Sequence, residues 1–393
     1  MASRLLFSTT AGIGHLHPLV PLARAAHASG HHVRVAAPAS LTSRLTELGL
    51  AHDVVPDRSS AQLADANAWF AHAAGLDTED GNAVVLREIF GRINTAATLP
   101  RLLALVDEWA PDLVIHEALE FSGPLAAEAA GVAHATVAMS THGVLRHWRH
   151  DVASGLAGHR ASLGLAPDAT CDPLLAEAPY LTSVPASIEG DGPLPRTTIR
   201  YRSEDLHDVG PAPGERDPGR PLLWATFGTE AGRMPGMLDR VVLPMADAVG
   251  DLDVDVLLTT GHAYEAPPLP ANVTVERYVP QEDVLAHATA VWCHGGFNTT
   301  LAALRFGRPL VISPLFAGDT WFNAERVAAV GAGVALHDLD AASIRAALER
   351  VLVEPRFRAR AVDVAAEMAA HPPPGEALAS MLDVALGVAA VAG

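Results

Sequence analysis

Short apolar runs alternate with segments of helical spacing along the whole chain, and this alternation predicts an α/β protein. Near the start, an apolar run at 5–8 precedes a glycine turn, a helix-like segment at 16–29 and a second apolar run at 33–36. A strand, a helix and another strand in this order predict parallel pairing, with helices packed on the sheet. The same order returns between residues 113 and 138.

The second half of the chain begins the alternation again after a break. The segment 208–221 reads DVGPAPGERDPGRP and predicts a linker, because it is rich in Pro, Gly and charge and has no periodicity. Two α/β halves joined in this way predict two facing Rossmann-like open sheets with a ligand cleft between the domains, at the carboxyl ends of the strands. Strands are expected in the second half at 222–227, 254–258, 273–278, 291–293, 310–312 and 333–336.

The stretch from 59 to 98 has weaker periodicity than its surroundings. We expect it to be irregular, and such insertions often carry substrate-recognition elements.

Composition narrows the class of protein. The 393 residues carry a net charge of −18, which argues against a nucleic-acid partner, and all 27 basic residues are arginine. Without lysine, Schiff-base chemistry and a P-loop lysine are excluded. Cys171 and Cys293 are far apart, and the N-terminus resembles no signal peptide. We therefore expect a cytoplasmic enzyme without a membrane segment.

A glycine turn after the first strand presents His15 at the start of a helix. The turn is no nicotinamide fingerprint, because His17 stands at the third glycine position and no acidic residue ends the second strand. A histidine here suits a general base, since its ordinary pKa lies near neutrality. The alternative is a capping or incidental histidine.

The segment Trp292 to Thr300, WCHGGFNTT, predicts an anion site at a helix N-terminus. Paired glycines allow close backbone approach to a ligand, and the free N–H groups of the first helical turn favour negative charge. His294 and Thr300 could add donors for a diphosphate, and Gly228 and Thr229 follow another strand end. No carboxylate cluster for a metal accompanies them, so we expect neither a metal nor another cofactor.

Two weaker signals lie nearby in the second half. Asp319 stands at an expected helix start, where it could cap the helix, bind sugar hydroxyls or do both. Tyr278, at a strand end before Pro280, could stack on a nucleotide base. Taken alone, Tyr278 is better interpreted as a core residue.

Together these segments resemble the GT-B glycosyltransferases that decorate small molecules, a family of plant and actinobacterial antibiotic enzymes that use nucleotide sugars. The resemblance runs nearly the whole length and is strongest from Tyr278 to Ala324. It implies domains at 1–207 for the acceptor and 222–375 for the donor, with a helix at 376–393 that packs back on the first.

The resemblance also assigns roles to single residues. His15, within Gly14-His15-Leu16-His17-Pro18, matches the family's catalytic histidine. Tyr278 takes the place of a base-stacking Trp, and Thr320 stands where Gln is common, which leaves the sugar open. The donor-binding set that it implies is Gly228, Thr229, Tyr278, Val279, His294, Gly295, Gly296, Asn298, Thr299, Thr300, Asp319 and Thr320.

In the family, an acidic residue after a middle strand supports the catalytic histidine. The match to the family is ambiguous by one residue, so either His116 or Glu117 occupies this position. We favour Glu117, because only a carboxylate would stabilise an imidazolium. A surface-facing Glu117 is the alternative. We expect His116, Ser140 and His142 to contact the acceptor, and His142, His147 and His150 to share one helix.

The resemblance implies an inverting transferase that moves a sugar from a dTDP- or UDP-linked donor to a small hydrophobic natural product. It implies a monomer or a homodimer. A nucleotide-sugar epimerase or hydrolase on the same fold is one alternative, and a non-catalytic auxiliary relative is another. The acceptor, the sugar and the choice between O- and C-attachment are left open.

Overall fold

The computed structural model describes residues 2–204, 209–210, 219–234 and 236–392. Contacts divide the chain into two compact units. The first unit contains Met1–Ser183, Asp191–Glu204 and His371–Gly393, and the second contains Val184–Gly190 and Asp205–Ala370. The predicted linker, 208–221, falls largely on residues outside the described ranges. The second unit includes the short segment Val184–Gly190, which the sequence assigned to the first domain.

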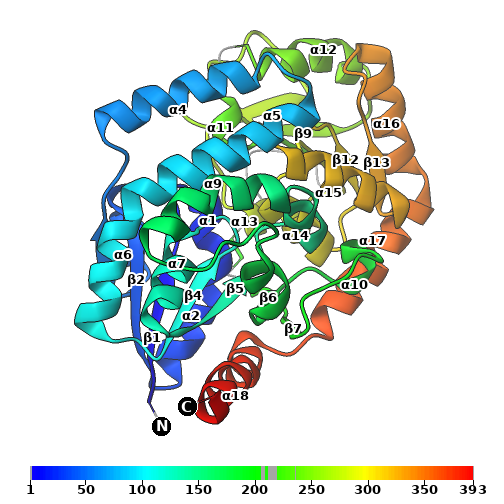
Figure 1. Ribbon diagram of the computed structural model, residues 1–393. Helices are drawn as coiled ribbons and strands as arrows, with labels where there is room; N and C mark the ends of the chain where they lie inside the picture. Colours follow the sequence, from blue (N-terminus) through cyan, green and yellow to red (C-terminus); the bar gives the residue numbers. More distant parts are fainter. Residues whose placement is uncertain (1, 205–208, 211–218, 235, 393) are drawn as a thin grey trace. The chain divides into compact units, whose positions relative to one another are not determined.

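The first unit is built on a parallel sheet in the order β3-β2-β1-β4-β5-β6-β7 (Figure 1). Its central strands β1, β4 and β5 are mostly buried, as expected for a parallel sheet covered by helices. The bounds of the strands are β1 Arg4–Ser8, β2 His32–Pro38, β3 His52–Val55, β4 Leu113–Glu117, β5 Ala133–Val137, β6 Tyr180–Thr182 and β7 Thr198–Arg200.

Helices join these strands and cover the sheet of the first unit. The C-terminal helix α18 (Pro374–Ala392) packs against α2, β5 and β7, so the end of the chain returns to the first sheet. The other helices are α1 Ile13–Leu16, η1 His17–Leu19, α2 Val20–Ala28, η2 Ala39–Leu41, α3 Thr42–Glu47, α4 Ser60–Ala73, α5 Thr78–Val84, η3 Val85–Asn94, α6 Thr95–Trp109, α7 Ser122–Ala130, α8 His142–His147, α9 Arg149–Ser162 and η4 Pro173–Glu177.

The expectation of an irregular stretch from 59 to 98 is wrong, because the structure is helical through most of it. Ser59 forms a capping box with Gln62, which starts α4, and Asp77 caps α5. Helix α5 continues into η3, which has π-helical hydrogen bonding, and then into α6. Helix α4 buries only Ala66 and Ala73, so the sequence there shows little of the apolar spacing that marks a helix.

The second unit repeats the architecture with a parallel sheet in the order β10-β9-β8-β11-β12-β13. Trp224, Phe227 and Trp292 are fully buried, and the rings of Phe227 and Trp292 meet edge to face. The strands are β8 Leu222–Thr226, β9 Asp255–Thr259, β10 Val273–Glu276, β11 Ala290–Cys293, β12 Leu310–Ile312 and β13 Gly333–Ala335. The helices are α10 Ala186–Glu189, α11 Gly228–Ala231, α12 Asp239–Val249, α13 Gln281–Leu285, α14 Phe297–Arg305, α15 Gly318–Ala329, α16 Ala341–Val353 and α17 Pro355–Ala369.

Each sheet has a point where the strand order reverses. In the first unit β1 lies between β2 and β4, and in the second β8 lies between β9 and β11. Open α/β sheets bind ligands outside the carboxyl ends of the strands at such a point. The candidate sites are therefore expected after β1 and β4 and after β8 and β11.

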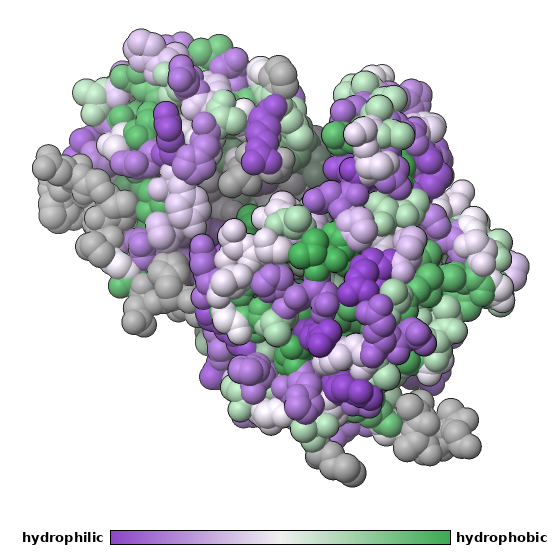
Figure 2. Space-filling view, turned by 90° about the vertical axis from the view of Figure 1, so that its left-hand side faces the viewer, coloured by the Kyte–Doolittle hydropathy of each residue, from purple (hydrophilic) through white to green (hydrophobic). Residues whose placement is uncertain are grey.

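The outer face shown in Figure 2 mixes polar and apolar residues, and its apolar areas are interrupted by polar side chains. Such a mixture is usual for a protein surface exposed to water. Within the described residues, no helix combines the length and apolarity that crossing a bilayer requires.

Candidate active site

His15 and Glu117 meet at the strand reversal of the first sheet. Strands β1 and β4 pair in parallel, so both chains leave the sheet at the same edge. After β1 the backbone turns at Gly12, whose φ of 114° suits only glycine, and α1 then carries His15. His15 Nδ1 lies 3.0 Å from Glu117 Oε1, which gives an imidazole–carboxylate pair.

The carboxylate of Glu117 is fixed from several directions. Its Oε1 also accepts hydrogen bonds from the Thr10 backbone N–H at 3.3 Å and from the Thr10 hydroxyl at 3.0 Å, and its Oε2 accepts one from Leu119 N at 2.7 Å. The Glu117 side chain is 0% exposed, whereas the His15 side chain is 19% exposed. A carboxylate at Nδ1 favours the tautomer in which Nδ1 carries the hydrogen and Nε2 carries the lone pair.

The residue in contact with His15 is thus Glu117 and not His116. His116 is 1% exposed, and its Nδ1 lies 3.1 Å from the carbonyl oxygen of Glu117. Its Nε2 lies 3.1 Å from the hydroxyl of Thr136. Burial lowers the pKa of His116 to about 3, so this imidazole stays neutral. This enclosed position does not fit the expected contact of His116 with an acceptor.

The other residues expected at the acceptor lie around the end of β5. Ser140 is largely buried, and within the described residues its hydroxyl has no hydrogen-bond partner. His142 is buried as well, with Nδ1 3.2 Å from the carbonyl of Pro193 and its ring edge-on to Tyr180. The single helix expected for His142, His147 and His150 is wrong, because the chain breaks at Trp148 between α8 and α9.

Phe90 is a residue of this site that the sequence did not indicate. It lies on the π-helical segment η3, is half-buried, and its ring centroid is 5.9 Å from that of His15. Helix α9 crosses η3 at very short range, since a Cβ added to Gly155 would lie 2.3 Å from the carbonyl oxygen of Arg87. Because Phe90 is far from His15 in the sequence, no local pattern could have revealed the contact.

The second unit encloses His294 at its own strand reversal. His294 follows β11 and is buried, and its ring stacks on Phe316 with centroids 5.3 Å apart and an interplanar angle of 13°. Glycines make room for the ring: a Cβ on Gly228 would lie 2.9 Å from Cε1, and one on Gly296 would lie 2.6 Å from Nε2. Both positions therefore require glycine as long as the imidazole keeps this place.

The imidazole of His294 carries an unsatisfied nitrogen. Within the described residues Nδ1 is buried without a hydrogen-bond partner. Burial lowers the pKa of His294 to about 4, so the ring is neutral at physiological pH and can donate one N–H. A buried polar atom without a partner is costly, and it is commonly explained by a ligand or a water that the site takes up.

Helix α14 begins next to His294. Its N-cap is Gly296, and no side chain caps the helix. Asn298 and Thr299 are half-buried in the first turn, and Thr300 is buried. An uncapped N-terminus presents backbone N–H groups to an anion. The first turn of α14 and His294 together can therefore bind an anionic group.

Gly295 closes the turn between β11 and α14. Its φ is +90°, and a Cβ there would lie 2.7 Å from Cγ2 of Ile312 and 2.9 Å from the carbonyl oxygen of Thr320. The Asn323 side chain holds the same turn by donating to the Gly295 carbonyl at 2.8 Å. These contacts give Gly295 a structural part in placing His294.

Asp319 and Thr320 both stand in the first turn of α15. The N-cap of α15 is Ala317, so Asp319 is not the cap that the sequence allowed; it stands half-buried in the first turn. The Thr320 hydroxyl donates to the carbonyl oxygens of Phe316 at 3.0 Å and Ala317 at 2.7 Å. Because its own turn of helix uses this hydroxyl, Thr320 is poorly suited to contact a sugar.

The remaining donor candidates lie at other strand ends of the same sheet. Tyr278 is 66% exposed, so its interpretation as a core tyrosine is wrong, and its ring is accessible for stacking. Val279, next to it, is half-buried. Gly228 begins α11 with φ +81°, whereas the side chain of Thr229 lies outside the described part of the structure.

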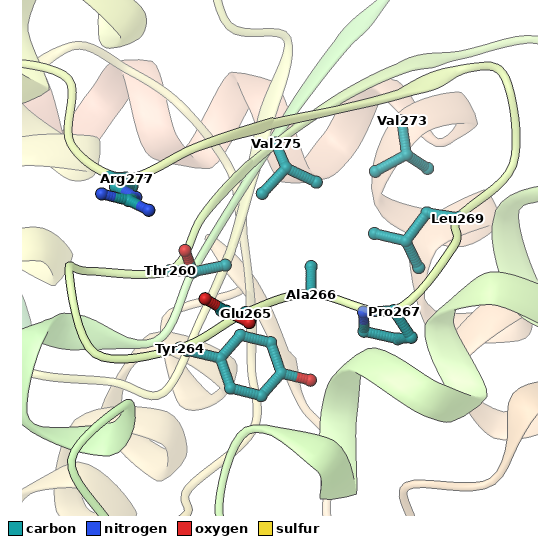
Figure 3. Close-up of a pocket in the computed structure, with 9 residues that line it drawn as sticks. All are labelled: Thr260, Tyr264, Glu265, Ala266, Pro267, Leu269, Val273, Val275 and Arg277. Atoms are coloured by element: carbon teal, nitrogen blue, oxygen red, sulfur yellow. The ribbon is translucent and has the colours of Figure 1, made fainter.

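A pocket of about 370 Å³ lies at the edge of this sheet, between the loop after β9 and the face of β10 (Figure 3). Thr260, Tyr264, Glu265 and Arg277 supply its polar groups. It includes none of the residues expected to bind the donor. The described residues also contain no group of three or more His, Cys, Asp or Glu side chains placed to hold a metal ion.

Both units of the chain match known protein domains. Residues 24–154 match the N-terminal domain, and residues 243–384 the C-terminal domain, of the family described as erythromycin biosynthesis protein CIII-like. The L-demethylnoviosyl transferase of Streptomyces niveus is 33% identical, over 94% of this chain and 95% of its own. The 4'-demethylrebeccamycin synthase of Lentzea aerocolonigenes is 29% identical, over 94% and 97%.

Solved structures show the same fold. The glycosyltransferase SnogD of Streptomyces nogalater superposes with a TM-score of 0.76 at 25% identity, covering 98% of this chain and all of its own. The glycosyltransferase VinC, solved in complex with dTDP, gives 0.73 at 25% identity, covering 97% and 99%. Both units thus follow the α/β architecture of GT-B enzymes. The chain therefore belongs to the EryCIII-like family of actinobacterial antibiotic glycosyltransferases.

Proposed function

We propose that this glycosyltransferase moves a sugar from a dTDP- or UDP-linked donor to a hydroxyl of a small hydrophobic natural product, with inversion at the anomeric carbon. The observation that carries this proposal is the pair formed by His15 Nδ1 and Glu117 Oε1 at 3.0 Å. It provides an imidazole whose Nε2 can take a proton, backed by a buried carboxylate that stabilises the charge formed.

In this reaction the acceptor hydroxyl oxygen attacks the anomeric carbon of the donor while the bond from that carbon to the diphosphate oxygen breaks. The hydroxyl proton passes to His15 Nε2, and the nucleoside diphosphate leaves from the opposite face of the sugar with the bonding electron pair. A single displacement of this kind inverts the anomeric centre. Positioned proton transfer contributes roughly 10²–10⁴-fold in rate.

The donor diphosphate is assigned to the second unit. His294 is neutral, buried and without a partner at Nδ1, and the uncapped first turn of α14 follows it. N–H donors of this kind stabilise the charge that grows on the leaving diphosphate. The open face of Tyr278 is proposed to stack on the base, and Asp319 to accept hydrogen bonds from sugar hydroxyls.

The relatives support both substrate classes. The tylactone mycaminosyltransferase of Streptomyces fradiae is named for a mycaminosyl group and the acceptor tylactone, and the L-demethylnoviosyl transferase for the L-demethylnoviosyl group that it transfers. The dTDP complex of VinC makes a dTDP-linked sugar our first choice of donor. We further propose that the diphosphate is bound without a metal ion, since His294 and the helix N-terminus supply donors for it.

The test is a transfer assay with dTDP- and UDP-sugars against a panel of polyketide and aromatic acceptors, with and without EDTA. Product is detected by mass spectrometry, and its anomeric configuration is determined by NMR. We expect a glycoside of inverted configuration that forms in the presence of EDTA.

A retained configuration would refute the inverting mechanism, and activity restored only by Mg²⁺ would refute the metal-free site. Donor consumed without acceptor would indicate an epimerase or a hydrolase instead, and a chain that binds donor but transfers nothing would fit an auxiliary protein.

A further inference from the structure

A second buried carboxyl group lies next to the His15–Glu117 pair. Glu120 follows Glu117 in the loop between β4 and α7, and it is 3% exposed. Its Oε2 accepts from the Ser8 hydroxyl at 2.5 Å and from Gly123 N at 2.9 Å, and its Oε1 accepts from Ser122 N at 2.8 Å and Gly123 N at 3.1 Å. A Cβ on Gly123 would lie 2.4 Å from the Ser8 oxygen and 2.6 Å from Glu120 Oε2, so strand, loop and carboxyl group are in direct contact.

The two carboxyl groups hold the same end of β1. Ser8 donates to Glu120, and Thr10, two residues later, donates to Glu117. The chain then runs through Gly12 to His15, which also contacts Glu117. The loop 117–120 thus fixes the start and the end of the segment that carries the proposed base.

We propose that Glu120 is a positioning residue of the transfer reaction: it anchors the segment that carries His15, and its buried negative charge strengthens the His15 base. This inference rests on the proposed function of His15. Glu120 contacts Ser8 and the backbone of Ser122 and Gly123. The proposed effect on His15 requires no direct contact between Glu120 and His15.

The electrostatics of the loop support this role. The pKa of Glu120 is raised to about 7, mainly by burial and to a smaller extent by the nearby Glu117 carboxylate, whereas the hydrogen bonds from Ser8, Gly123 and Ser122 oppose the shift. The charge of Glu120 therefore changes within the physiological range. An ionised Glu120 favours the imidazolium form of His15 and so makes the imidazole a stronger base.

The groups that the structure places around Glu120 are hydrogen-bond donors and one like charge. The first turn of α7 provides backbone N–H groups, and Glu117 provides a like charge. His116, on β4, is neutral and directs Nδ1 to the Glu117 carbonyl and Nε2 to Thr136. Glu117, whose carboxylate interacts with Glu120 and contacts His15, links the charge of Glu120 to the imidazole.

The experiment compares Glu120→Gln with Glu128→Gln, a matched removal of one carboxylate from the far end of α7, where Glu128 pairs with Arg160. The pKa of the His15 imidazole is measured by NMR titration of histidine-labelled protein, with the His15 signal assigned from a His15→Gln sample. We expect Glu120→Gln to lower the pKa of His15 by roughly one unit, as the loss of a nearby charge does. Glu128→Gln should leave it unchanged.

The pH profile of kcat/KM for transfer gives the second readout. In Glu120→Gln the acid limb should move to lower pH by the same amount, and the plateau should fall because the base is weaker. A purely structural cap of α7 would lower the melting temperature and leave both the pKa of His15 and the acid limb in place, which would overturn the proposal.

The two readouts separate this proposal from the proposed function. Because the NMR titration needs no turnover, a lowered His15 pKa without transfer activity would refute the function and leave the Glu120–His15 coupling standing.

If Glu120→Gln does not fold, Ser8→Ala serves in its place, because it removes the hydroxyl donor and leaves the carboxyl group. Because the Ser8 hydrogen bond lowers the pKa of Glu120, its loss in Ser8→Ala should raise that pKa. Glu120 should then carry less negative charge at pH 7, and the pKa of His15 should fall. An unchanged His15 pKa in that variant would count against the coupling.

Discussion

Glu117 contacts His15 across 102 positions of sequence, and the 3.0 Å separation of their side-chain atoms follows from the pairing of β1 with β4. Ser8 lies in register with His116 in these two strands, so the chain segments that follow them emerge side by side. The pairing of His15 with Glu117 therefore depends on the order of the strands and on the glycine turn at Gly12.

Replacing His15 by Ala should abolish most transfer and leave donor binding intact. The loss of a positioned general base costs roughly 10²–10⁴-fold in rate, whereas the residues assigned to the diphosphate are in the other unit. The rate is measured at saturating acceptor, and donor affinity by isothermal titration with dTDP. Transfer near the wild-type rate would show that the base is elsewhere, or that the acceptor arrives already ionised.

Replacing Glu117 by Ala should reduce transfer less than His15→Ala, because Glu117 orients and charge-balances the histidine without taking the proton. The variant also leaves Thr10 N and Leu119 N without their acceptor, so a stability loss of about 1–3 kcal/mol accompanies it. Glu117→Gln keeps most of the volume and separates the two effects. A silent Glu117→Gln beside a severe His116→Gln would contradict the contact seen here.

The sequence was informative where a motif combines special backbone with special chemistry. The glycine turn before His15 and the paired glycines after His294 both mark strand ends where a side chain must meet a ligand, and the strands around them were placed to within a few residues. The choice of Glu117 over His116 came from charge alone, since only a carboxylate can stabilise an imidazolium.

What the sequence could not reveal depends on contacts between distant segments. Phe90 reaches His15 through a π-helical segment whose period differs from that of an α-helix. Glu120 looks like an ordinary helix-start residue until Ser8 is seen beside it. Thr320 looked available, but its hydroxyl is bonded within its own helix turn.

Replacing His294 by Ala should weaken binding of dTDP and change that of thymidine little, since the proposed contact is to the diphosphate. Gly296→Ala should have a similar effect, because the new methyl group would lie 2.6 Å from His294 Nε2 and displace the ring. The double variant should then bind dTDP about as weakly as His294→Ala alone. Additive losses in titration calorimetry would show that Gly296 acts independently, and equal losses for thymidine and dTDP would indicate a collapsed unit.

Replacing Phe90 by Ala should raise KM for bulky aromatic acceptors and leave dTDP affinity unchanged. The half-buried ring lies against His15 and offers an apolar wall beside the proposed base. Truncating it should cost about 1–3 kcal/mol of acceptor binding, or roughly 10–200-fold in kcat/KM. Phe90→Leu, which keeps an apolar side chain, is the matched control and should lose less. An acceptor series whose kcat/KM values are all unchanged in Phe90→Ala would place the acceptor away from this ring.

The stability of the first unit should fall in mild acid because His116 is buried in its neutral form. Burial lowers the pKa of His116 to about 3 in the folded protein, and the unfolded chain has the ordinary value of about 6.5. Between these values the unfolded state binds a proton that the folded state does not. The free energy of unfolding is therefore unaffected by this group above pH 6.5 and decreases as the pH falls from 6.5 toward 3. The slope is at most about 1.4 kcal/mol per pH unit.

His116→Gln isolates this effect, because the variant cannot take up the proton in either state. Its loss of the hydrogen bonds to Thr136 and to the Glu117 carbonyl should make it less stable than the wild type at pH 7.5. The difference in unfolding free energy should shrink steadily at pH 6.0 and 5.0, because only the wild type has a histidine that must stay neutral in the folded state while it is protonated in the unfolded state. Glu120 titrates in the opposite sense, since its raised pKa favours the folded state at low pH, but it is present in both proteins and cancels from the comparison. Urea denaturation at the three pH values measures the difference, and a gap that stays constant would show that His116 is protonated in the folded protein or exposed to water.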